Sequence, residues 1–401
     1  MHESTSYDEP AEYSLRLREL ADSVGIGSVR AFAWRDLDDP DAGGSEVFME
    51  HVFQRWARAG IDVSVRTSAA PGLPERVSRD RVEAIRRGGR MAVFAQAGLA
   101  ERSGRHGPRP DAVVEVWNGV PFLSPLWWRG PRITFLHHVH RDMWRLMLPG
   151  PLAVAGDVLE RKIAPRLYRS RRVMTLSESS RHELIDELGW RDDLVTVASP
   201  GIPAQFVPGT GEIRSPRPLV VGVGRLAPAK RWPMLLDALF AVKATVPDLE
   251  VVFIGEGEQR GVLEQMIRDH DAGSWVRLVG RVSDAELVEW YQRAWLMSSM
   301  SLAEGWGMTI TEAAGCGTPA VVSRITGHAD AVWEGRSGLL VGDVAEYVAA
   351  TSGLLRDPNR LEQLRDGARE RAASLSWSAV AVAAMESLVA DARARPARRA
   401  P

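Results

Sequence analysis

The chain has 401 residues, a length that favours two domains over a single hydrophobic core. Hydrophobic residues make up 45% and charged residues 25%, as in a globular protein. The net charge of −2 gives no whole-chain attraction to nucleic acid, and we expect no nucleic-acid partner. The single cysteine, Cys316, excludes an internal disulfide, and neither a signal peptide nor an apolar run of about 18 residues is found. We therefore expect a cytoplasmic protein.

The first half of the chain alternates short β-branched runs with amphipathic helical stretches. This is the pattern of βαβ units and parallel sheets. Helices are predicted between the strands, for example over residues 46–59 and 179–188. The strands are predicted at 29–34, 62–67, 91–96, 112–117, 132–137, 172–177 and 194–199.

A segment rich in proline and glycine, residues 199–218, interrupts this pattern and is interpreted as a linker. A second series of strands follows it, predicted at 219–224, 250–255, 276–280, 294–299, 319–323 and 338–342. We therefore predict an α/β protein with two doubly wound parallel-sheet domains. Ligands of such sheets bind beyond the carboxyl ends of the strands, so the loops that follow strands are the places to look for a site.

Two cations follow the predicted strand 219–224. Arg225 begins the loop after Gly224, and Lys230 lies just before a helix whose start Pro233 marks. Basic residues are almost all arginine in this chain, which makes a lysine at this place informative. A guanidinium beside an ammonium suits a diphosphate that gains charge as its ester bond breaks. The alternative is a pair of surface cations beside a turn.

Two glutamates, Glu304 and Glu312, flank a glycine-broken turn. Gly305 and Gly307 prevent a regular helix around Glu304, so we predict that the helix begins near Met308. Free amides at that start form an anion site. Glu304 can accept hydrogen bonds from sugar hydroxyls, and Glu312, about one turn inside the helix, can hold the two hydroxyls of a ribose.

The stretch EGWGMTITEAAGCGTPAVVS, with GRLAPAK upstream, resembles the retaining glycosyltransferases of family 4. Their GT-B fold has two Rossmann-like domains that face a deep cleft. Further segments are similar to the family in family order over roughly residues 29–385, among them DPDAGGSE, VMTLSESSRHELIDELG, VTVASPGI and LVGRVSDAELVEWYQRAW. Trp306 and Gly315 depart from the commoner phenylalanine and alanine, and both changes leave the charged groups untouched.

The resemblance implies an acceptor-binding domain over residues 1–207 and a donor-binding domain over residues 208–377, with a last helix, about 378–395, that packs back on the first domain. It implies catalytic roles for His137, Arg225, Lys230 and Glu304. It implies donor binding by Gly43, Gly44, Gly224, Arg225, Lys230, Val282, Glu304, Gly305, Trp306, Gly307, Met308, Thr309 and Glu312. The donor, a UDP- or GDP-linked sugar, is a substrate, and no cofactor is expected.

The run HHVHRDMW follows the predicted strand 132–137. His137, His138 and His140 have a spacing that permits metal ligation. Successive residues of a strand point to opposite faces, so we favour hydrogen bonding by His137 in the cleft over metal ligation or plain packing. His140, Asp142 and Trp144 are candidates for acceptor recognition, with a structural role as the alternative.

Asp36 and Asp38 also follow a predicted strand and superficially match the metal-binding motif of the other glycosyltransferase fold, GT-A. That fold would leave the second half of the chain unexplained. We interpret the two aspartates as an acidic loop before Gly43 and Gly44, and we expect no required metal.

Residues 152–172 combine an apolar stripe with six basic residues, Arg161, Lys162, Arg166, Arg169, Arg171 and Arg172. A basic amphipathic face can hold an enzyme on anionic lipid. Pro165 interrupts the helix, and ordinary packing is the alternative. Weak peripheral contact with the inner face of the membrane therefore stays open.

The predicted reaction is transfer of a sugar to an acceptor hydroxyl with retention of anomeric configuration. The acceptor attacks from the face that the diphosphate leaves, and a departing phosphate oxygen takes its proton. Two alternatives remain: a nucleotide-sugar epimerase of the same architecture, and a non-catalytic protein that binds sugar nucleotides. The sequence does not define the donor base, the sugar, the acceptor or the oligomeric state.

Overall fold

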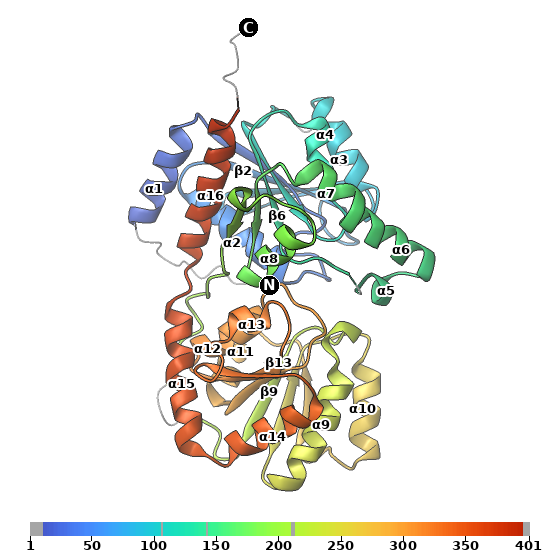
Figure 1. Ribbon diagram of the computed structural model, residues 1–401, viewed down its shortest axis with the longest axis vertical. Helices are drawn as coiled ribbons and strands as arrows, with labels where there is room; N and C mark the ends of the chain where they lie inside the picture. Colours follow the sequence, from blue (N-terminus) through green and yellow to red (C-terminus); the bar gives the residue numbers. More distant parts are fainter. Residues whose placement is uncertain (1–10, 106, 142, 210–212, 396–401) are drawn as a thin grey trace. The chain divides into compact units, whose positions relative to one another are not determined.

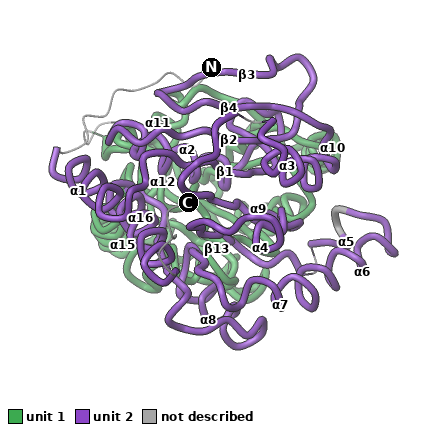
Figure 2. The backbone as a smooth tube through the Cα atoms, turned by 90° about the horizontal axis from the view of Figure 1, so that it is seen from above, with its two compact units in different colours: residues 1–3, 202–376 green, residues 4–201, 377–401 purple. Residues whose placement is uncertain are grey.

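The computed structural model describes residues 11–105, 107–141, 143–209 and 213–395 (Figure 1). The chain divides into two compact units, which Figure 2 shows in different colours. Unit 1 is formed by Ile202–Ser376. Within the described residues, unit 2 is formed by residues 11–201 together with the segment from Trp377. The structure thus changes unit between residues 201 and 202 and again between residues 376 and 377, and the sequence-based boundaries stand at 207 and 377.

Unit 2 is built on an eight-stranded sheet with the strand order β3-β4-β2-β1-β5-β6-β7-β8. All neighbours are parallel except the β3–β4 pair. The central strand β5 is buried along its whole length, as continuous apolar runs in parallel sheets are. The strands are β1 (Ser28–Phe32), β2 (Asp62–Thr67), β3 (Arg76–Arg79), β4 (Val82–Arg86), β5 (Ala112–Trp117), β6 (Arg132–Leu136), β7 (Val173–Thr175) and β8 (Val195–Val197).

The helices of unit 2 include the last helix of the chain, α16 (Trp377–Arg393). Its Ala381 carbonyl accepts a hydrogen bond from Trp56 Nε1 at 2.9 Å, and Asp391 Oδ2 accepts one from Arg132 N at 2.9 Å. The other helices are α1 (Ala11–Asp22), α2 (Gly44–Arg58), α3 (Val93–Arg102), α4 (Ser124–Trp127), α5 (Met143–Met147), α6 (Gly150–Val158), α7 (Ala164–Tyr168) and α8 (Glu178–Asp186).

Unit 1 is built on a six-stranded, fully parallel sheet with the order β11-β10-β9-β12-β13-β14. In chain order this is 3-2-1-4-5-6, the order of the Rossmann fold. The strands are β9 (Leu219–Val223), β10 (Glu250–Ile254), β11 (Val276–Gly280), β12 (Leu296–Ser299), β13 (Ala320–Ser323) and β14 (Gly338–Val341). The helices are α9 (Trp232–Thr245), α10 (Arg260–Asp269), α11 (Asp284–Arg293), α12 (Met308–Gly315), α13 (His328–Ala331), α14 (Val344–Leu355) and α15 (Pro358–Ala373).

The predicted parallel-sheet α/β architecture is confirmed, and one predicted strand is wrong. Residues 91–96 do not form a strand, because the helix α3 begins at Val93. The apolar run there continues into helix-forming residues up to Arg102, and a short apolar run alone does not distinguish a strand from a buried helix. The hairpin of β3 and β4 was not predicted, since its arginine-rich sequence hides the alternation of a strand.

Within the described ranges, no single helix is both long and apolar enough to cross a membrane. The bent pair of α15 and α16 meets that test only when the two helices are taken together.

Candidate active site

The predicted donor residues of unit 1 lie in loops at the carboxyl ends of its strands or in the first half of α12, which follows one of these loops. Arg225 follows β9, Glu304 follows β12, and β9 and β12 are neighbours in the sheet. The strand order reverses between these two strands, because β10 lies on one side of β9 and β12 on the other. This is the topological switch point, where doubly wound sheets bind ligands.

The loop after β9 is fixed through its backbone. Gly224 has φ +147°, and a Cβ on Gly255 would lie 2.0 Å from the Gly224 oxygen, so these two loops touch without side chains between them. Trp232 Nε1 donates a hydrogen bond to the Arg225 carbonyl at 2.9 Å. The Arg225 side chain is exposed. The fixed backbone thus presents a guanidinium to solvent at the switch point.

The second cation, Lys230, forms an ion pair with Glu304 through Nζ and Oε1. Lys230 ends the short 3₁₀ turn Pro228–Lys230 before α9. Ser301 Oγ donates to the same carboxylate oxygen at 2.9 Å, and Leu302 N donates to the Ala229 oxygen at 2.8 Å. The two loops are therefore joined by side chains and by backbone.

The Glu304 carboxyl is ionised in this setting. Burial by itself raises its pKa, but the charge of Lys230, the nearby His328 and the hydrogen bonds from Lys230 and Ser301 outweigh burial and bring the pKa to about 2. At neutral pH Glu304 is therefore a hydrogen-bond acceptor with no proton to give. It can bind hydroxyls and cannot serve as a general acid.

The helix α12 begins at Met308, as predicted, behind the N-cap Gly307. Gly307 has φ +102° and supplies no side-chain cap. Ile310 N donates to the Gly307 carbonyl oxygen at 2.9 Å, so the amides of Met308 and Thr309 are the ones that remain for a ligand. A Cβ on Gly307 would lie 2.8 Å from Ile310 Cδ1 and 3.0 Å from His328 Cδ2. Glycine is therefore needed here for conformation and for space.

His328 and Gly327 belong to this site and were not predicted. A Cβ on Gly327 would lie 2.4 Å from the backbone carbonyl oxygen of Glu304 and 2.7 Å from Trp306 N. The loop after β13 therefore supports the backbone of the loop that carries Glu304. His328 is buried, and its Nδ1 lies 3.1 Å from the Ser323 oxygen. The signal in the sequence was the glycine–histidine pair that closely follows a strand.

Glu312 lies one turn inside α12 and is half-buried. Burial, and next the charge of Asp284, raise its pKa to about 7, although the Tyr291 hydroxyl donates to Oε2 at 3.4 Å. Asp284 begins α11, and Val282 lies two residues before it, half-buried between β11 and α11. Glu312 thus faces the loop after β11.

The two departures from the resemblance have structural reasons. The Trp306 indole is buried, and the Arg371 guanidinium lies 5.3 Å from its ring centroid. The side chain therefore belongs to the packing of unit 1 and leaves only the backbone of Gly305 and Trp306 for a ligand. A Cβ on Gly315 would lie 2.8 Å from the Phe206 oxygen, so alanine at this position would force the backbone apart.

In unit 2, His137 follows β6 and is buried. Its ring contacts the Phe48 ring edge-on with 4.8 Å between centroids, and its Nε2 has no hydrogen-bond partner among the described residues. Burial, with a smaller effect of His138, lowers the His137 pKa to about 3. The imidazole is therefore neutral at physiological pH.

The predicted acceptor residues His140 and Trp144 are both buried around Glu160. Glu160 accepts from His140 N at 3.1 and 3.0 Å, lies 3.2 Å from His140 Nδ1 and accepts from Trp144 Nε1 at 2.9 Å. Burial raises the Glu160 pKa, and His140 and Trp144 reverse this to a net lowering. The two side chains hold the loop after β6 in place. Asp142 lies outside the described residues.

Gly43 and Gly44 lie at the start of α2. Gly43 is the N-cap, and its N–H donates to Glu46 Oε2 at 2.7 Å. Gly44 is the first residue of the helix. Both positions lack a Cβ atom at a helix N-terminus, and the Gly43 amide is taken by Glu46. The donor-binding role that the resemblance implied for them stays a prediction.

Comparison with known proteins places both halves of the chain in one group. Residues 42–206 match the family model described as Glycosyltransferase Family 4, and residues 207–371 match the model described as Glycosyl transferases group 1. A D-inositol 3-phosphate glycosyltransferase of Frankia alni is 30% identical, with 85% of this chain and 93% of the relative covered. The chain belongs to the family 4 glycosyltransferases.

Further relatives and solved structures agree with this membership. D-inositol 3-phosphate glycosyltransferase 2 of Catenulispora acidiphila is 29% identical over 92% of this chain and 94% of its own. A sucrose-phosphate synthase structure from Thermosynechococcus elongatus superimposes with a TM-score of 0.75 at 19% identity, covering 88% of this chain and 96% of that one. The structure of Anabaena HepE in complex with UDP-glucose superimposes with a TM-score of 0.70 at 18% identity, covering 90% of this chain and 98% of that one. This family 4 glycosyltransferase has the GT-B fold.

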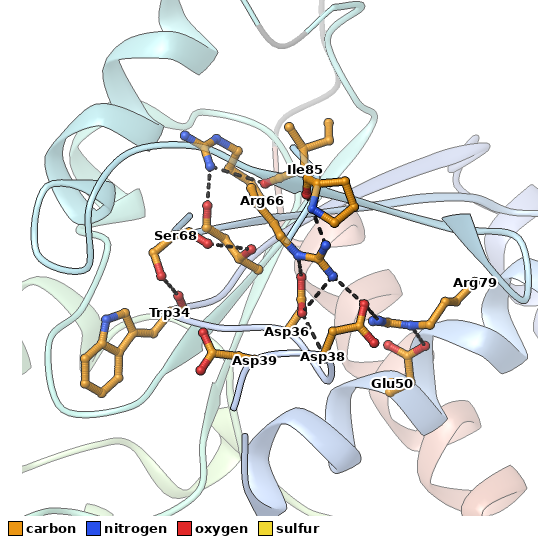
Figure 3. Close-up of polar contacts among 12 residues, drawn as sticks. Trp34, Asp36, Asp38, Asp39, Glu50, Arg66, Ser68, Arg79 and Ile85 are labelled. Atoms are coloured by element: carbon orange, nitrogen blue, oxygen red, sulfur yellow. Dashed lines mark hydrogen bonds and ion pairs between the residues drawn. The ribbon is translucent and has the colours of Figure 1, made fainter. Parts of the chain in front are cut away.

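In this glycosyltransferase the acidic loop after β1 is held by arginines (Figure 3). Arg86 donates to both oxygens of Asp36, at 2.6 and 3.1 Å, and both side chains are buried. Asp38 pairs with Arg86 and with Arg79, and Arg79 also lies 3.4 Å from Glu50. Each of the two aspartates is thus committed to a guanidinium.

In the described part of the chain, no three or more histidine, cysteine, aspartate or glutamate side chains are grouped so that they could hold a metal ion. The expectation that no metal is required stays a prediction.

Proposed function

We propose that this glycosyltransferase transfers a sugar from a nucleoside-diphosphate sugar to an acceptor hydroxyl with retention of anomeric configuration. The observation that carries the proposal is the Lys230–Glu304 ion pair beside the uncapped start of α12. It sets a cation and free amides next to a carboxylate that stays ionised. This combination suits a donor with a negative diphosphate at one end and a hydroxylated sugar at the other.

The diphosphate is bound by positive charge and by amides. Lys230 has three N–H donors, and the contact with Glu304 uses one of them. Arg225 adds an exposed guanidinium from the same loop after β9. The amides of Met308 and Thr309, in the first turn of α12, lie at the same end of the sheet as these two cations. As the sugar–phosphate bond breaks, these groups stabilise the charge on the leaving diphosphate.

UDP is the donor nucleotide that we favour over GDP. Two structures of the same fold contain UDP-glucose or UDP according to their descriptions, which supports UDP for this chain. Glu312, half-buried one turn inside α12, is the acceptor for the ribose hydroxyls. Val282 lies before α11 near the residues that surround Glu312, and we assign it a contact with the base.

The transfer needs no dedicated base. Glu304 holds the hydroxyls of the transferred sugar and, with its pKa near 2, keeps its negative charge. The acceptor oxygen forms its bond to the anomeric carbon on the face from which the phosphate oxygen departs. That phosphate oxygen takes the acceptor proton, so charge and atoms balance. His137 is neutral and is assigned a hydrogen bond at the reacting centre through the resemblance of its loop.

The test is product analysis with a panel of donors and acceptors. UDP- and GDP-sugars are incubated with and without acceptor, and the acceptor panel begins with D-inositol 3-phosphate because curated relatives carry that name. We expect nucleoside diphosphate to form in step with a glycoside, and NMR to show the anomeric configuration of the donor in the product. An inverted anomer overturns the retaining mechanism. An epimerised donor without acceptor indicates an epimerase, and no turnover on any donor indicates a binding protein.

A further inference from the structure

The segment from α6 to α7 forms a nearly continuous helix at the periphery of unit 2. Both views show α6 at the edge of this unit, on the side away from α1 and α16 (Figures 1 and 2). The turn of residues Leu159–Ile163 between α6 and α7 is a π-helix. Pro165 follows it and has no N–H for a helical hydrogen bond, which accounts for the widened turn.

One side of this helix anchors it to unit 2. Ala153, Ala164 and Tyr168 are buried, and the Tyr168 hydroxyl donates to Glu115 Oε1 at 2.7 Å. Glu160 from the π turn accepts the hydrogen bonds of His140 described above. The anchored side fixes the orientation of the other side, which is therefore presented to solvent as a rigid surface.

The solvent side exposes large apolar side chains. Leu152, Val154 and Ile163 are 58%, 59% and 47% exposed. Single exposed apolar residues are ordinary, but three within residues 152–163, two in α6 and one in the π-helix, are a candidate contact surface. Three exposed basic residues, Arg161, Lys162 and Arg166, lie beside these apolar residues. We call the six residues together the α6–α7 face.

The charge of this region is opposite to that of the whole chain. Seven basic residues and two acidic residues lie between 145 and 172, and one of the acidic residues, Glu160, is buried in its own network, whereas the chain carries a net −2. Arg161 lies 3.5 Å from Asp157. In the described residues Lys162, Arg166 and Arg169 have no ion pair with a carboxylate, so their charge is available to a partner.

We propose that the α6–α7 face docks unit 2 on the surface of a membrane that contains anionic phospholipid. The apolar side chains enter the boundary between headgroups and acyl chains, and the basic side chains reach the headgroup phosphates. Anionic lipid attracts basic residues that lie near its surface. Nucleic acid would use the basic residues but would leave Leu152, Val154 and Ile163 in water, so the interleaved apolar residues favour lipid.

The test is sedimentation of the full chain with vesicles of phosphatidylcholine alone and of phosphatidylcholine mixed with phosphatidylglycerol. We expect binding to the anionic vesicles that weakens as salt rises. Ile163→Glu, and the double variant Lys162→Glu with Arg166→Glu, are expected to lose about tenfold or more in apparent affinity. The matched control is Val262→Glu, a 51% exposed apolar residue of unit 1, which is expected to bind as the wild type does.

Folding is checked independently by circular dichroism and by the binding of UDP, which involves unit 1. Equal binding to neutral and anionic vesicles, or variants that bind as the wild type does, would overturn the proposal. Binding to a DNA duplex without binding to vesicles would also overturn it. A dimer that Ile163→Glu abolishes, in a protein that does not bind vesicles, would overturn it as well.

Discussion

The Lys230 ammonium and the Glu304 carboxylate form an ion pair that joins the loop after β9 to the loop after β12. The two side chains are 27% and 19% exposed, so the pair is shielded from water yet open to a ligand. Because these loops flank the switch point of the Rossmann sheet, the proposed function expects the diphosphate and the sugar of a donor to meet at this pair. The other assignments in unit 1 depend on this placement.

Removal of either partner of this pair should slow transfer. Lys230→Ala and Glu304→Gln are each expected to lower kcat by about 10²-fold or more, the usual effect of losing one charge-stabilising group. Initial rates with saturating donor measure it. Lys243→Ala is the control, because Lys243 lies in the last turn of α9 and donates to the Leu249 oxygen. Near-normal turnover in both site variants would contradict the assignment.

Binding of the donor should strengthen as pH rises through about 7. Burial raises the Glu312 pKa to about 7, and only the ionised carboxylate accepts from both ribose hydroxyls. Calorimetric titration of UDP between about pH 6 and 8, roughly one unit on each side of that pKa, is compared with the same titration of Glu312→Gln. The nucleotide's own titration is common to both proteins, so the difference isolates Glu312. Parallel pH profiles would show that Glu312 does not contact the ribose.

The same raised pKa has a consequence for stability. The Glu312 carboxyl binds its proton more tightly in the folded chain than in the unfolded chain, where the pKa is near 4.5. Its contribution to stability is therefore fully present below pH 4.5 and is lost as pH rises through about 7. Glu312→Gln is expected to remove this part of the pH dependence in urea unfolding. An unchanged slope in that window would contradict the raised pKa.

Alanine at Gly327 should disturb catalysis more than folding. The new Cβ would lie 2.4 Å from the backbone carbonyl oxygen of Glu304, so the loop that carries Glu304 must move. A displacement of this kind is expected to lower kcat by about 10²-fold. The positive φ of this position, which alanine rarely adopts, is expected to lower the free energy of unfolding by about 1–2 kcal/mol. Gly353→Ala in α14 meets no atom within 4 Å and is expected to be neutral or stabilising. Similar rates for the two variants would refute the contact between the loops.

The acidic loop after β1 should prove structural. Asp36→Asn removes the buried charge partner of Arg86, whose guanidinium keeps only the more exposed Asp38, and is expected to cost about 3 kcal/mol in urea unfolding. Asp41 pairs with Arg90 and its side chain is 58% exposed. Asp41→Asn should therefore lower the free energy of unfolding by at most about 1 kcal/mol. Chelators should leave the transfer rate unchanged. A stable Asp36→Asn variant together with loss of activity in a chelator would instead indicate a metal site.

Most of the fold could be predicted because the strands of both sheets are short apolar runs at regular spacing. The strands at 62–67, 112–117 and 276–280 were predicted with their exact bounds. Residues 91–96 were assigned to the wrong element type, since a run of five apolar residues before Gln96 fits a helix as well as a strand. The hairpin of β3 and β4 has side chains whose role only the folded sheet reveals, such as Arg79 and Arg86 on the acidic loop.

The site was predictable to the extent that its groups are adjacent in sequence. The start of α12 at Met308 follows from the glycines before it. His328 was missed, because its contacts with Gly307 and Ser323 depend on the packing of two strand-end loops. His140 and Trp144 were predicted as acceptor residues, and the structure buries them on Glu160, a partner in a separate helical segment that the sequence does not indicate.

The most direct measurement is a crystal structure of the protein with UDP. The account predicts the pyrophosphate on Lys230, Arg225 and the amides of Met308 and Thr309, with the ribose hydroxyls on Glu312. UDP bound at any other place, or bound in that loop cluster with the phosphates away from Lys230, would contradict it.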